Sequence, residues 1–310
     1  MKIAESIDLF LSHCRYEKNL NDKTIEAYKT DLLQFDVFLK TQKVTSIHKV
    51  DKQSIKLFVQ HLAKFEVRTI KRKIASSKAY LNFLEFEDYI LVNPYRKVKL
   101  RIKEPRQLPV VLELEEVKRL FQVLKSECER AKDKSFFLYG EKLRDLSILE
   151  LLFATGIRVS ELCGLRIEDI NLETGSLLVH GKGNKERIIQ ICNSETTKIL
   201  KDYYRLYTAR IKTVGYFLVS RLGTPLSQQS VRFLISKYCK LAGIRKNVTP
   251  HTFRHTFATL LLEQDVDIKY IQHFLGHSSI NTTQIYTHVN KKKQLEILST
   301  KHPRHLFVLG

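Results

Sequence analysis

The chain has 310 residues, of which 43% are hydrophobic and 28% are charged, and it contains no Trp. This apolar fraction excludes a disordered protein, and the length predicts about two domains. Fifty-three Lys and Arg residues against 33 Asp and Glu residues give a formal net charge of +20. Because such an excess repels itself in a compact fold, it favours a protein that binds a polyanion, and nucleic acid is the expected partner.

The sequence also excludes three classes: membrane, secreted and disulfide-rich proteins. No stretch reaches the roughly 20 apolar residues that a membrane span requires. The first ten residues, MKIAESIDLF, include two acids and no long apolar run, which excludes a secretion signal. The five cysteines are odd in number and form no CxxC pair. We therefore expect reduced thiols in a cytoplasmic protein rather than disulfides or a zinc finger.

The first 93 residues contain neither Gly nor Pro, which predicts an all-helical first domain over 1–93. Four helices are expected, over 3–17, 22–41, 52–65 and 67–86. In the last of these, apolar residues recur at helical spacing and should face a core, namely Val67, Ile70, Ile74, Leu81 and Leu84. The basic residues beside this stripe are expected to contact DNA phosphates rather than only solvent: Arg68, Lys71, Arg72 and Lys78.

The segment 94–111 is predicted to be a linker between two domains. Its three prolines forbid a continuous helix, and six Lys or Arg residues stand against one Glu before Gln107. An extended basic connector suits a protein that encircles a DNA duplex, because the link must cross the phosphate backbone. Arg101 and Lys103 are the phosphate contacts expected here; the alternative is an ordinary polar linker.

The second domain, over 112–310, is predicted to combine helices with a little strand. A helix marked by Leu146, Leu149 and Leu152 should stop at Gly156, a C-terminal cap. A small antiparallel meander should follow, with turns at 173–175 and 181–184. Helices resume near Thr196. The expected fold class is mainly α with a small antiparallel β-sheet, as a helical N-terminal domain and an α+β domain.

Histidines cluster late in the chain and raise the possibility of a metal site. His251 and His255, like His273 and His277, have the four-residue spacing that places two imidazoles on one helix face. However, Arg254 lies between the first pair and the acid of an HExxH motif is absent. We therefore expect neither a metal nor another cofactor.

The same region indicates an anion site. In VTPHTFRH, Thr249 can cap a helix whose first residue is Pro250, and free N–H groups at a helix start attract negative charge. His251 and Arg254 share a face of that first turn. Further on, Asn281 and Gln284 have capping-box spacing, which would make Tyr286 project near the start of a short helix beside His277.

Two more basic residues are candidates for this site. Arg158 follows the break at Gly156, with Glu161 one turn later. This spacing is typical of a modest surface ion pair, and the alternative is that Glu161 holds a buried guanidinium ready for a phosphate. Lys182 lies at the tip of the predicted hairpin in HGKGNKER, where a side chain faces solvent or reaches into a site. The nucleotide-binding motifs GxxxxGK[ST] and GxGxxG are both missing.

Taken in order, the blocks ATGIRVSELCGL, HGKGNKER, HTFRHTFAT and LGHSSINTTQIYTHV resemble the tyrosine recombinase family, closest to the bacterial Xer-type enzymes. The late HPR of 302–304 is similar to the Xer tail. The resemblance implies a helical core-binding domain that clasps DNA and a catalytic domain whose C-terminal tail contacts another subunit. It also implies the catalytic set Arg158, Lys182, His251, Arg254, His277 and Tyr286, with Tyr286 as the nucleophile. Two departures are a long 125–144 segment and an apolar end after HPR.

For function, the resemblance implies site-specific recombination through a 3′-phosphotyrosine and a Holliday junction, without metal or ATP. Double-stranded DNA carrying a recombination site, a homo- or hetero-tetramer and a division-septum DNA translocase are the implied partners, with a place in the cytoplasm on the nucleoid. Resolution of chromosome or plasmid dimers is the expected role. The alternatives are an integrase of a phage, transposon or integron, a type IB topoisomerase, and a non-catalytic architectural DNA-binding protein.

Overall fold

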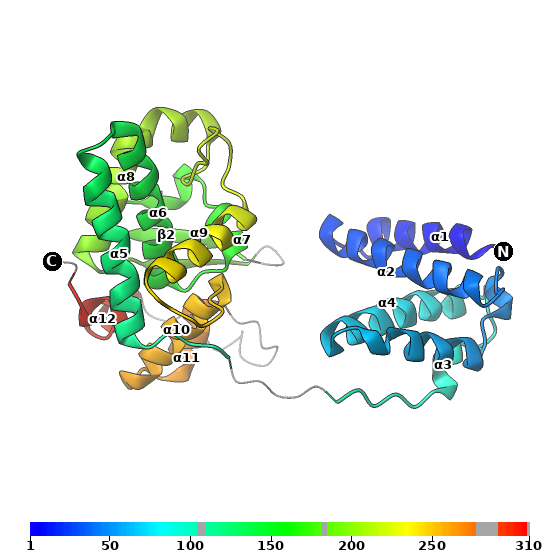
Figure 1. The fold of residues 1–310 in the computed structure, drawn as a ribbon. Coiled ribbons are helices and arrows are strands. Elements are labelled where there is room, and N and C mark those ends of the chain that lie inside the picture. The colour runs from blue at the N-terminus through cyan, green and yellow to red at the C-terminus, as the bar shows by residue number, and fades with distance from the viewer. Residues whose placement is uncertain (104–108, 182–184, 277–290, 309–310) are drawn as a thin grey trace. The chain divides into compact units, whose positions relative to one another are not determined.

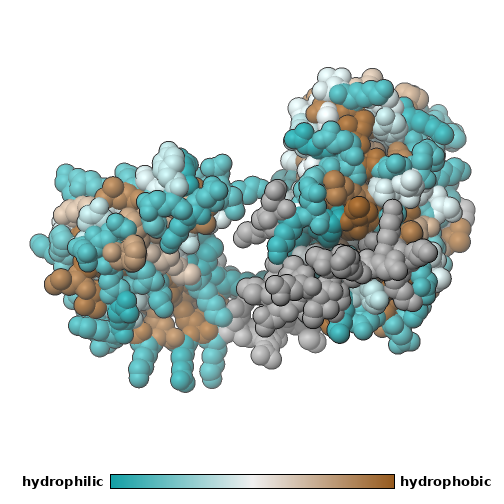
Figure 2. Space-filling view, turned by 180° about the vertical axis from the view of Figure 1, so that it is seen from behind, coloured by the Kyte–Doolittle hydropathy of each residue, from teal (hydrophilic) through white to brown (hydrophobic). Residues whose placement is uncertain are grey.

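The computed structural model describes residues 1–103, 109–181, 185–276 and 291–308, the last range without the side chains of 291–294. It divides into two compact units, Met1–Gln107 and Leu108–Gly310 (Figure 1). Hydrophilic side chains cover much of the face drawn in Figure 2. None of the described helices combines the length and the apolar character needed to cross a membrane.

The first unit is a bundle of four α-helices, as the lack of Gly and Pro predicts. They are α1 (Ile3–Tyr16), α2 (Asp22–Thr41), α3 (Lys52–His61) and α4 (Val67–Phe86). The first ends one residue before its expected bound, and the third ends four residues early, because the chain tightens into a 3₁₀ turn, Leu62–Lys64, after His61. The side chains of Asn21 and Asp51 cap the starts of α2 and α3 by accepting bonds from backbone N–H groups.

Aromatic side chains fill the core of this unit. Phe10, Phe35, Phe58 and Tyr80 are fully buried, and the Tyr80 hydroxyl is hydrogen-bonded to the hydroxyl of Ser6. On α4, the C-terminal half of the predicted stripe is buried, at Leu81 and Leu84, and its first half is partly buried, at Val67, Ile70 and Ile74. The helix is therefore oriented as its apolar periodicity indicates.

After α4 the chain forms a short 3₁₀ turn, Pro94–Lys97, and then runs on without regular structure. The Arg96 guanidinium forms a fork with the Glu85 carboxylate, at 2.7 to 3.0 Å, so this linker cation is paired with an acid of α4. Arg101 and Lys103 are exposed. The part of the linker at 104–108 lies outside the described residues.

The second unit is built around one buried helix, α6. Its described helices are α5 (Leu114–Lys132), α6 (Phe136–Thr155), α7 (Val159–Cys163), α8 (Ser194–Val214), α9 (Gln228–Leu241), α10 (Pro250–Glu263), α11 (Ile268–Leu275) and α12 (Lys291–Thr300). Helices α5, α8, α9 and α10 pack against α6, whose C-terminal half is buried on every side. The long 125–144 segment consists of the end of α5, a short turn and the start of α6.

A three-stranded antiparallel sheet completes the unit, with strand order β1-β2-β3. The strands are β1 (Ile170–Asn171), β2 (Ser176–His180) and β3 (Glu186–Gln190). Leu177 pairs with Ile189 and Val179 pairs with Arg187. Because side chains alternate along a strand, Arg187 lies on the same face of β3 as the buried Ile189. The predicted fold class, mainly α with a small antiparallel sheet, is confirmed.

The C-terminal tail packs into the core of its own unit. In the 3₁₀ turn Pro303–Leu306, Arg304 has no exposed surface and forms hydrogen bonds to the carboxylates of Glu150 and Glu195. Ile297, Leu298 and Phe307 belong to the same hydrophobic core. The tail residues described here are thus structural within this chain, and a contact with a second subunit stays a prediction.

Candidate active site

The site begins where α6 ends. Gly156 adopts a left-handed conformation (φ +59°), and its N–H bonds to the Leu152 carbonyl, which closes the helix as the sequence predicts. A Cβ atom at this position would lie 2.6 Å from Phe257 and 2.9 Å from Leu275. Gly156 therefore allows α10 and α11 to approach the turn that carries Arg158.

Arg158 is the N-cap of the short helix α7, and Glu161 is its third residue. The Glu161 carboxylate accepts hydrogen bonds from the Arg158 backbone N–H at 2.8 Å and from its Nη1 at 2.8 Å. The Glu161 side chain is only 5% exposed and the Arg158 side chain is 35% exposed, so a buried carboxylate holds a guanidinium that is partly accessible. This favours the second interpretation of the sequence, except that the guanidinium is half-buried and not buried. Glu161 holds the Arg158 guanidinium in a fixed orientation.

Arg254 reaches the same place from α10. This helix begins as predicted, with Thr249 as N-cap and Pro250 as its first residue. Arg254 is 5% exposed, and its guanidinium donates to the carbonyls of Gly156 (2.9 Å) and Leu275 (2.5 Å). His251, one turn earlier on α10, is exposed. The structure therefore buries the guanidinium and leaves the imidazole at the surface.

The C-terminus of α11 joins these cations. Three successive carbonyls each accept a hydrogen bond from a different arginine: Phe274 from Arg187, Leu275 from Arg254, and Gly276 from Arg158. The last carbonyls of a helix have no partner within the helix and carry partial negative charge, so cations are favourable there. Helix α11 thus gathers three guanidiniums into one cluster, which we name the arginine cluster: Arg158, Arg187 and Arg254.

The arginine cluster is electrically unbalanced. Among the described residues, Glu161 is the carboxylate hydrogen-bonded to it, and Arg254 is bonded only to carbonyls. Burial, followed by repulsion from Arg158, lowers the pKa of Arg254 to about 10, so it remains charged at neutral pH. Burial raises the pKa of Glu161, but hydrogen bonds from Arg187 and Arg158 outweigh it and leave the pKa lowered. The cluster suits an anion such as a phosphate, which guanidiniums bind through paired N–H donors.

Arg187 is the member of this cluster that the sequence analysis missed. It lies on β3, where its Nη1 and Nη2 donate to the two oxygens of Glu161 at 3.1 and 2.9 Å. Strand alternation could have identified it, because alternation places the Arg187 side chain on the buried face of β3, together with Ile189. An inward charged residue on a strand requires a buried partner.

The other predicted catalytic residues, Lys182, His277 and Tyr286, lie outside the described residues, and so do Asn281 and Gln284. Their roles stay predictions. Gly276, the residue before His277, is described and is left-handed (φ +61°). Across the described residues, no group of three or more His, Cys, Asp or Glu side chains is placed to hold a metal ion.

The predicted DNA contacts of α4 are all exposed: Arg68, Lys71, Arg72 and Lys78. Arg72 has a further role, because its Nη1 donates to Asp31 at 2.5 Å. The Asp31 side chain is 1% exposed and also accepts bonds from Lys73 and Ser76. Arg72 therefore helps to neutralise a buried acid between α2 and α4, which the sequence analysis did not predict.

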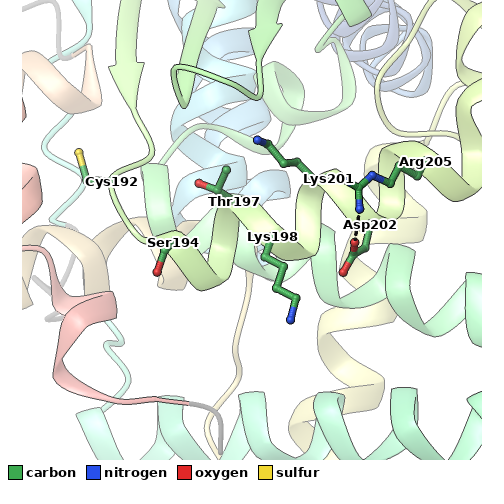
Figure 3. A pocket seen from close by; sticks show the side chains of 7 residues that line it. All are labelled: Cys192, Ser194, Thr197, Lys198, Lys201, Asp202 and Arg205. Carbon is green, nitrogen blue, oxygen red and sulfur yellow. Dashed lines mark hydrogen bonds and ion pairs between the residues drawn. The ribbon is translucent and has the colours of Figure 1, made fainter.

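A surface pocket at the start of α8 is a separate feature (Figure 3). It is lined by Cys192, Ser194, Thr197, Lys198, Lys201, Asp202 and Arg205. Lys201 pairs with Glu173 at 3.0 Å and Arg205 with Asp202 at 3.4 Å. Because these two cations already have carboxylate partners, the pocket matches an anion less well than the arginine cluster does.

The arginine cluster is a site suited to an anion in a strongly basic, mainly helical chain, and comparison with known families identifies the class. Residues 110–293 match the phage integrase family, and residues 7–88 match the phage integrase N-terminal SAM-like domain. The chain therefore belongs to the phage integrase family. It is a tyrosine recombinase, which cuts and rejoins DNA strands through a tyrosine-linked intermediate, and the predicted resemblance is confirmed.

Relatives of the same length place the chain among Xer-type members. It is 46% identical over 303 residues to a tyrosine recombinase of Agathobacter rectalis, covering 97% of both chains. It is 37% identical to tyrosine recombinase XerD of Staphylococcus haemolyticus, covering 96% of this chain and 98% of that one. The fold is also similar to a XerH site-specific recombinase bound to difH substrate, at 24% identity with a TM-score of 0.67, over 95% of this chain and 83% of that one.

Proposed function

We propose that this chain resolves chromosome or plasmid dimers by recombination at a specific DNA site, with Tyr286 as the nucleophile. The observation that carries the proposal is the arginine cluster, in which Arg158 and Arg254 are anchored on adjacent carbonyls of α11. The dimer-resolving role is supported by relatives named XerC and XerD, of which the chain covers 95% and 98%.

The two arginines stabilise charge on the phosphate under attack. Within the described part of the chain, hydrogen bonds occupy two of the five N–H donors of each guanidinium. The remaining donors suit the non-bridging oxygens of a scissile phosphate, whose charge a metal ion would otherwise stabilise. Since the acceptors of both arginines are fixed by the protein, the donors are oriented before DNA binds.

The tyrosine supplies the covalent step. The Tyr286 oxygen attacks the scissile phosphorus and loses its proton, the P–O5′ bond breaks, and the leaving 5′ oxygen takes up a proton. A free tyrosine has a pKa of about 10 and is a weak nucleophile at neutral pH, so the positive charge of the arginines and a base, His251, assist it. Lys182 is the acid for the leaving group, and His277 donates a hydrogen bond to the phosphate.

Strand exchange follows from the reversibility of this step. One phosphodiester bond is replaced by one phosphotyrosine ester, so the 5′ hydroxyl of a partner strand can reverse the reaction without ATP. Two successive pairs of exchanges in a four-subunit assembly pass through a Holliday junction. The assembly contains this chain alone or this chain with a paralogue, and a division-septum DNA translocase is the proposed activator in the cytoplasm.

The N-terminal unit and the linker bind the phosphate backbone of the DNA. The proposed phosphate contacts are exposed cations of α4 and of the linker: Arg68, Lys71, Arg72, Lys78, Arg101 and Lys103. Such contacts position a protein on the duplex without reading its sequence. We propose the bounds 1–93 for the core-binding domain, 94–111 for the linker and 112–310 for the catalytic domain.

Covalent capture on a suicide substrate tests the function. The substrate carries a nick that lets the cleaved fragment diffuse away, so the protein stays attached to the DNA. We expect the wild-type chain to form this complex in excess EDTA, and Tyr286→Phe to bind the same DNA without forming it. Capture by Tyr286→Phe, or cleavage that requires a metal ion, would contradict the proposal.

A further inference from the structure

Arg187 occupies a position that the catalytic roles above leave unexplained. Its side chain is 9% exposed, and its guanidinium bonds on two sides. On one side it forms a fork with both oxygens of Glu161, and on the other its Nε donates to the Phe274 carbonyl at 2.9 Å. Arg187 therefore links β3 to α7 and to the C-terminus of α11.

The fork with Arg187 fixes the carboxylate on which Arg158 depends. Glu161 Oε1 accepts from Arg158 Nη1 and Arg187 Nη1, and Oε2 accepts from the Arg158 backbone N–H and Arg187 Nη2. Each carboxylate oxygen thus has two donors, one from each arginine. Among the described residues, Arg158 and Arg187 donate these four hydrogen bonds, so removal of Arg187 would leave the carboxylate held by Arg158 alone, the residue that it orients.

The contact with α11 fixes the second anchor of Arg158. Arg187 bonds to the carbonyl of Phe274, two residues before the Gly276 carbonyl that accepts from Arg158. A Cβ atom on Gly276 would lie 3.0 to 3.1 Å from three atoms of the Arg187 guanidinium, so the two groups are in close contact. Among the described residues, Arg187 therefore bonds to one partner of the Arg158 side chain, Glu161, and packs against the other, Gly276.

We propose that Arg187 is a positioning residue that orients the Arg158 guanidinium toward the scissile phosphate. This inference rests on the proposed function, because it assigns Arg158 to that phosphate. Arg187 acts through Glu161 and α11 and not by contact with DNA. A lysine cannot replace it, because an ammonium group offers a single point of contact where the guanidinium provides a planar fork and a third donor.

The test compares two conservative substitutions of buried arginines. Arg187→Lys removes the fork within the cluster. Arg144→Lys is the matched control, because the Arg144 side chain is also little exposed (13%) and also pairs with a carboxylate of the same unit, that of Asp145 at 2.8 Å. Single-turnover cleavage of the suicide substrate is measured with a normal scissile phosphate and with a methylphosphonate, which lacks the negative charge that Arg158 stabilises. DNA affinity and thermal unfolding are measured on the same samples.

We expect Arg187→Lys to cleave the phosphate substrate about 100-fold more slowly than wild type, the cost of a small misplacement in a preorganised site. Its DNA affinity should be unchanged, and the difference from wild type should shrink on the methylphosphonate. Arg144→Lys should cleave both substrates at wild-type rates. Arg187→Gln, which also lacks the fork, should behave as Arg187→Lys does.

Three results would overturn the inference: wild-type cleavage by a folded Arg187 variant, an equal deficit on both substrates, or loss of folding in both Arg187 variants while Arg144→Lys folds. The last two would assign Arg187 a purely structural role. Failure of the wild-type chain to form a covalent complex would contradict the proposed function itself, so the two failures are distinguishable.

Discussion

At the scale of single residues, Gly276 limits how the arginine cluster can be arranged. Its backbone is left-handed, and the Arg187 guanidinium packs where a side chain would begin. Gly243 is also left-handed (φ +68°), but no atom lies within 4 Å of a Cβ placed there. The two glycines therefore share one backbone requirement and differ in their surroundings.

This difference predicts different outcomes for two alanine substitutions. Both Gly276→Ala and Gly243→Ala should lower the free energy of unfolding by about 1 kcal/mol, the cost of a left-handed alanine. Only Gly276→Ala should also displace Arg187, and a displacement worth 1.4 kcal/mol in the transition state would slow cleavage about tenfold. Urea unfolding and single-turnover cleavage measure the two effects. Equal cleavage rates for both variants would contradict the tight packing of the cluster.

The sequence indicated two arginines of this site, but it did not indicate all of the residues that they contact. Arg158 and Arg254 follow from motifs, and Glu161 was one of two interpretations because its spacing also suits a surface pair. Arg187 was missed because nothing in HGKGNKER indicates that β3 passes beside α7. The pairing of Arg72 with Asp31 was missed for the same reason, since 41 residues separate the two. Contacts between distant segments depend on the fold and not on local pattern.

At the scale of secondary structure elements, the tail is fixed to α6 by a buried histidine. His302 Nε2 donates to the Ala154 carbonyl at 2.8 Å, and its Nδ1 accepts from the Arg304 backbone N–H at 2.9 Å. One nitrogen donates and the other accepts, which requires the neutral imidazole. Burial lowers the pKa of His302 to about 4.

Acid should therefore destabilise the catalytic unit. Because the pKa is about 6.5 in the unfolded chain and about 4 in the folded one, the unfolded state binds more protons between these values. The stabilising effect of His302 is present above pH 6.5 and is lost as the pH falls toward 4. We expect the free energy of unfolding to drop by about 2 kcal/mol more in wild type than in His302→Asn between pH 7 and 5.

His302→Asn is the appropriate comparison because an amide has both an N–H group that donates and an oxygen that accepts, but does not titrate in this range. Urea unfolding at each pH gives the measurement. Parallel pH profiles for the two proteins would show that His302 is not buried in the neutral form, and the proposed anchoring of the tail to α6 would then be wrong.

Helices could be predicted from the sequence where residues such as Gly or Pro mark their ends. The four N-terminal helices follow from the lack of Gly and Pro, and the end of α6 follows from Gly156. The start of α6 at Phe136 was not predicted, ten residues before the first leucine of its apolar stripe. The first residues of α6 are exposed although two of them, Phe136 and Phe137, are apolar, so this end of the helix does not show the separate apolar and polar faces that reveal a helix in a sequence.

At the scale of the whole molecule, the net charge of +20 and the basic linker predict a strong dependence of DNA binding on salt. Each phosphate contact contributes about 0.9 to the slope of log Kobs against log salt concentration. If Arg101 and Lys103 each bind a phosphate, replacing both with Ala should reduce the slope by about 1.8.

The matched control is the double substitution of Arg130 and Lys132 by Ala. Both residues are exposed, and together they carry the same charge as the linker pair. We expect this control to leave the slope unchanged. An equal reduction in slope for the two double variants would mean that overall charge alone governs binding, which would contradict phosphate contacts by the linker.

The central claim is that Tyr286 becomes esterified to DNA at the arginine cluster, and locating the covalent bond tests it most directly. The wild-type chain is trapped on the suicide substrate, the DNA is trimmed to its terminal nucleotide, and the modified peptide is sequenced by mass spectrometry. We predict the added mass on Tyr286, joined through a 3′ phosphate. Attachment at any other residue, or through a 5′ phosphate, would contradict the account.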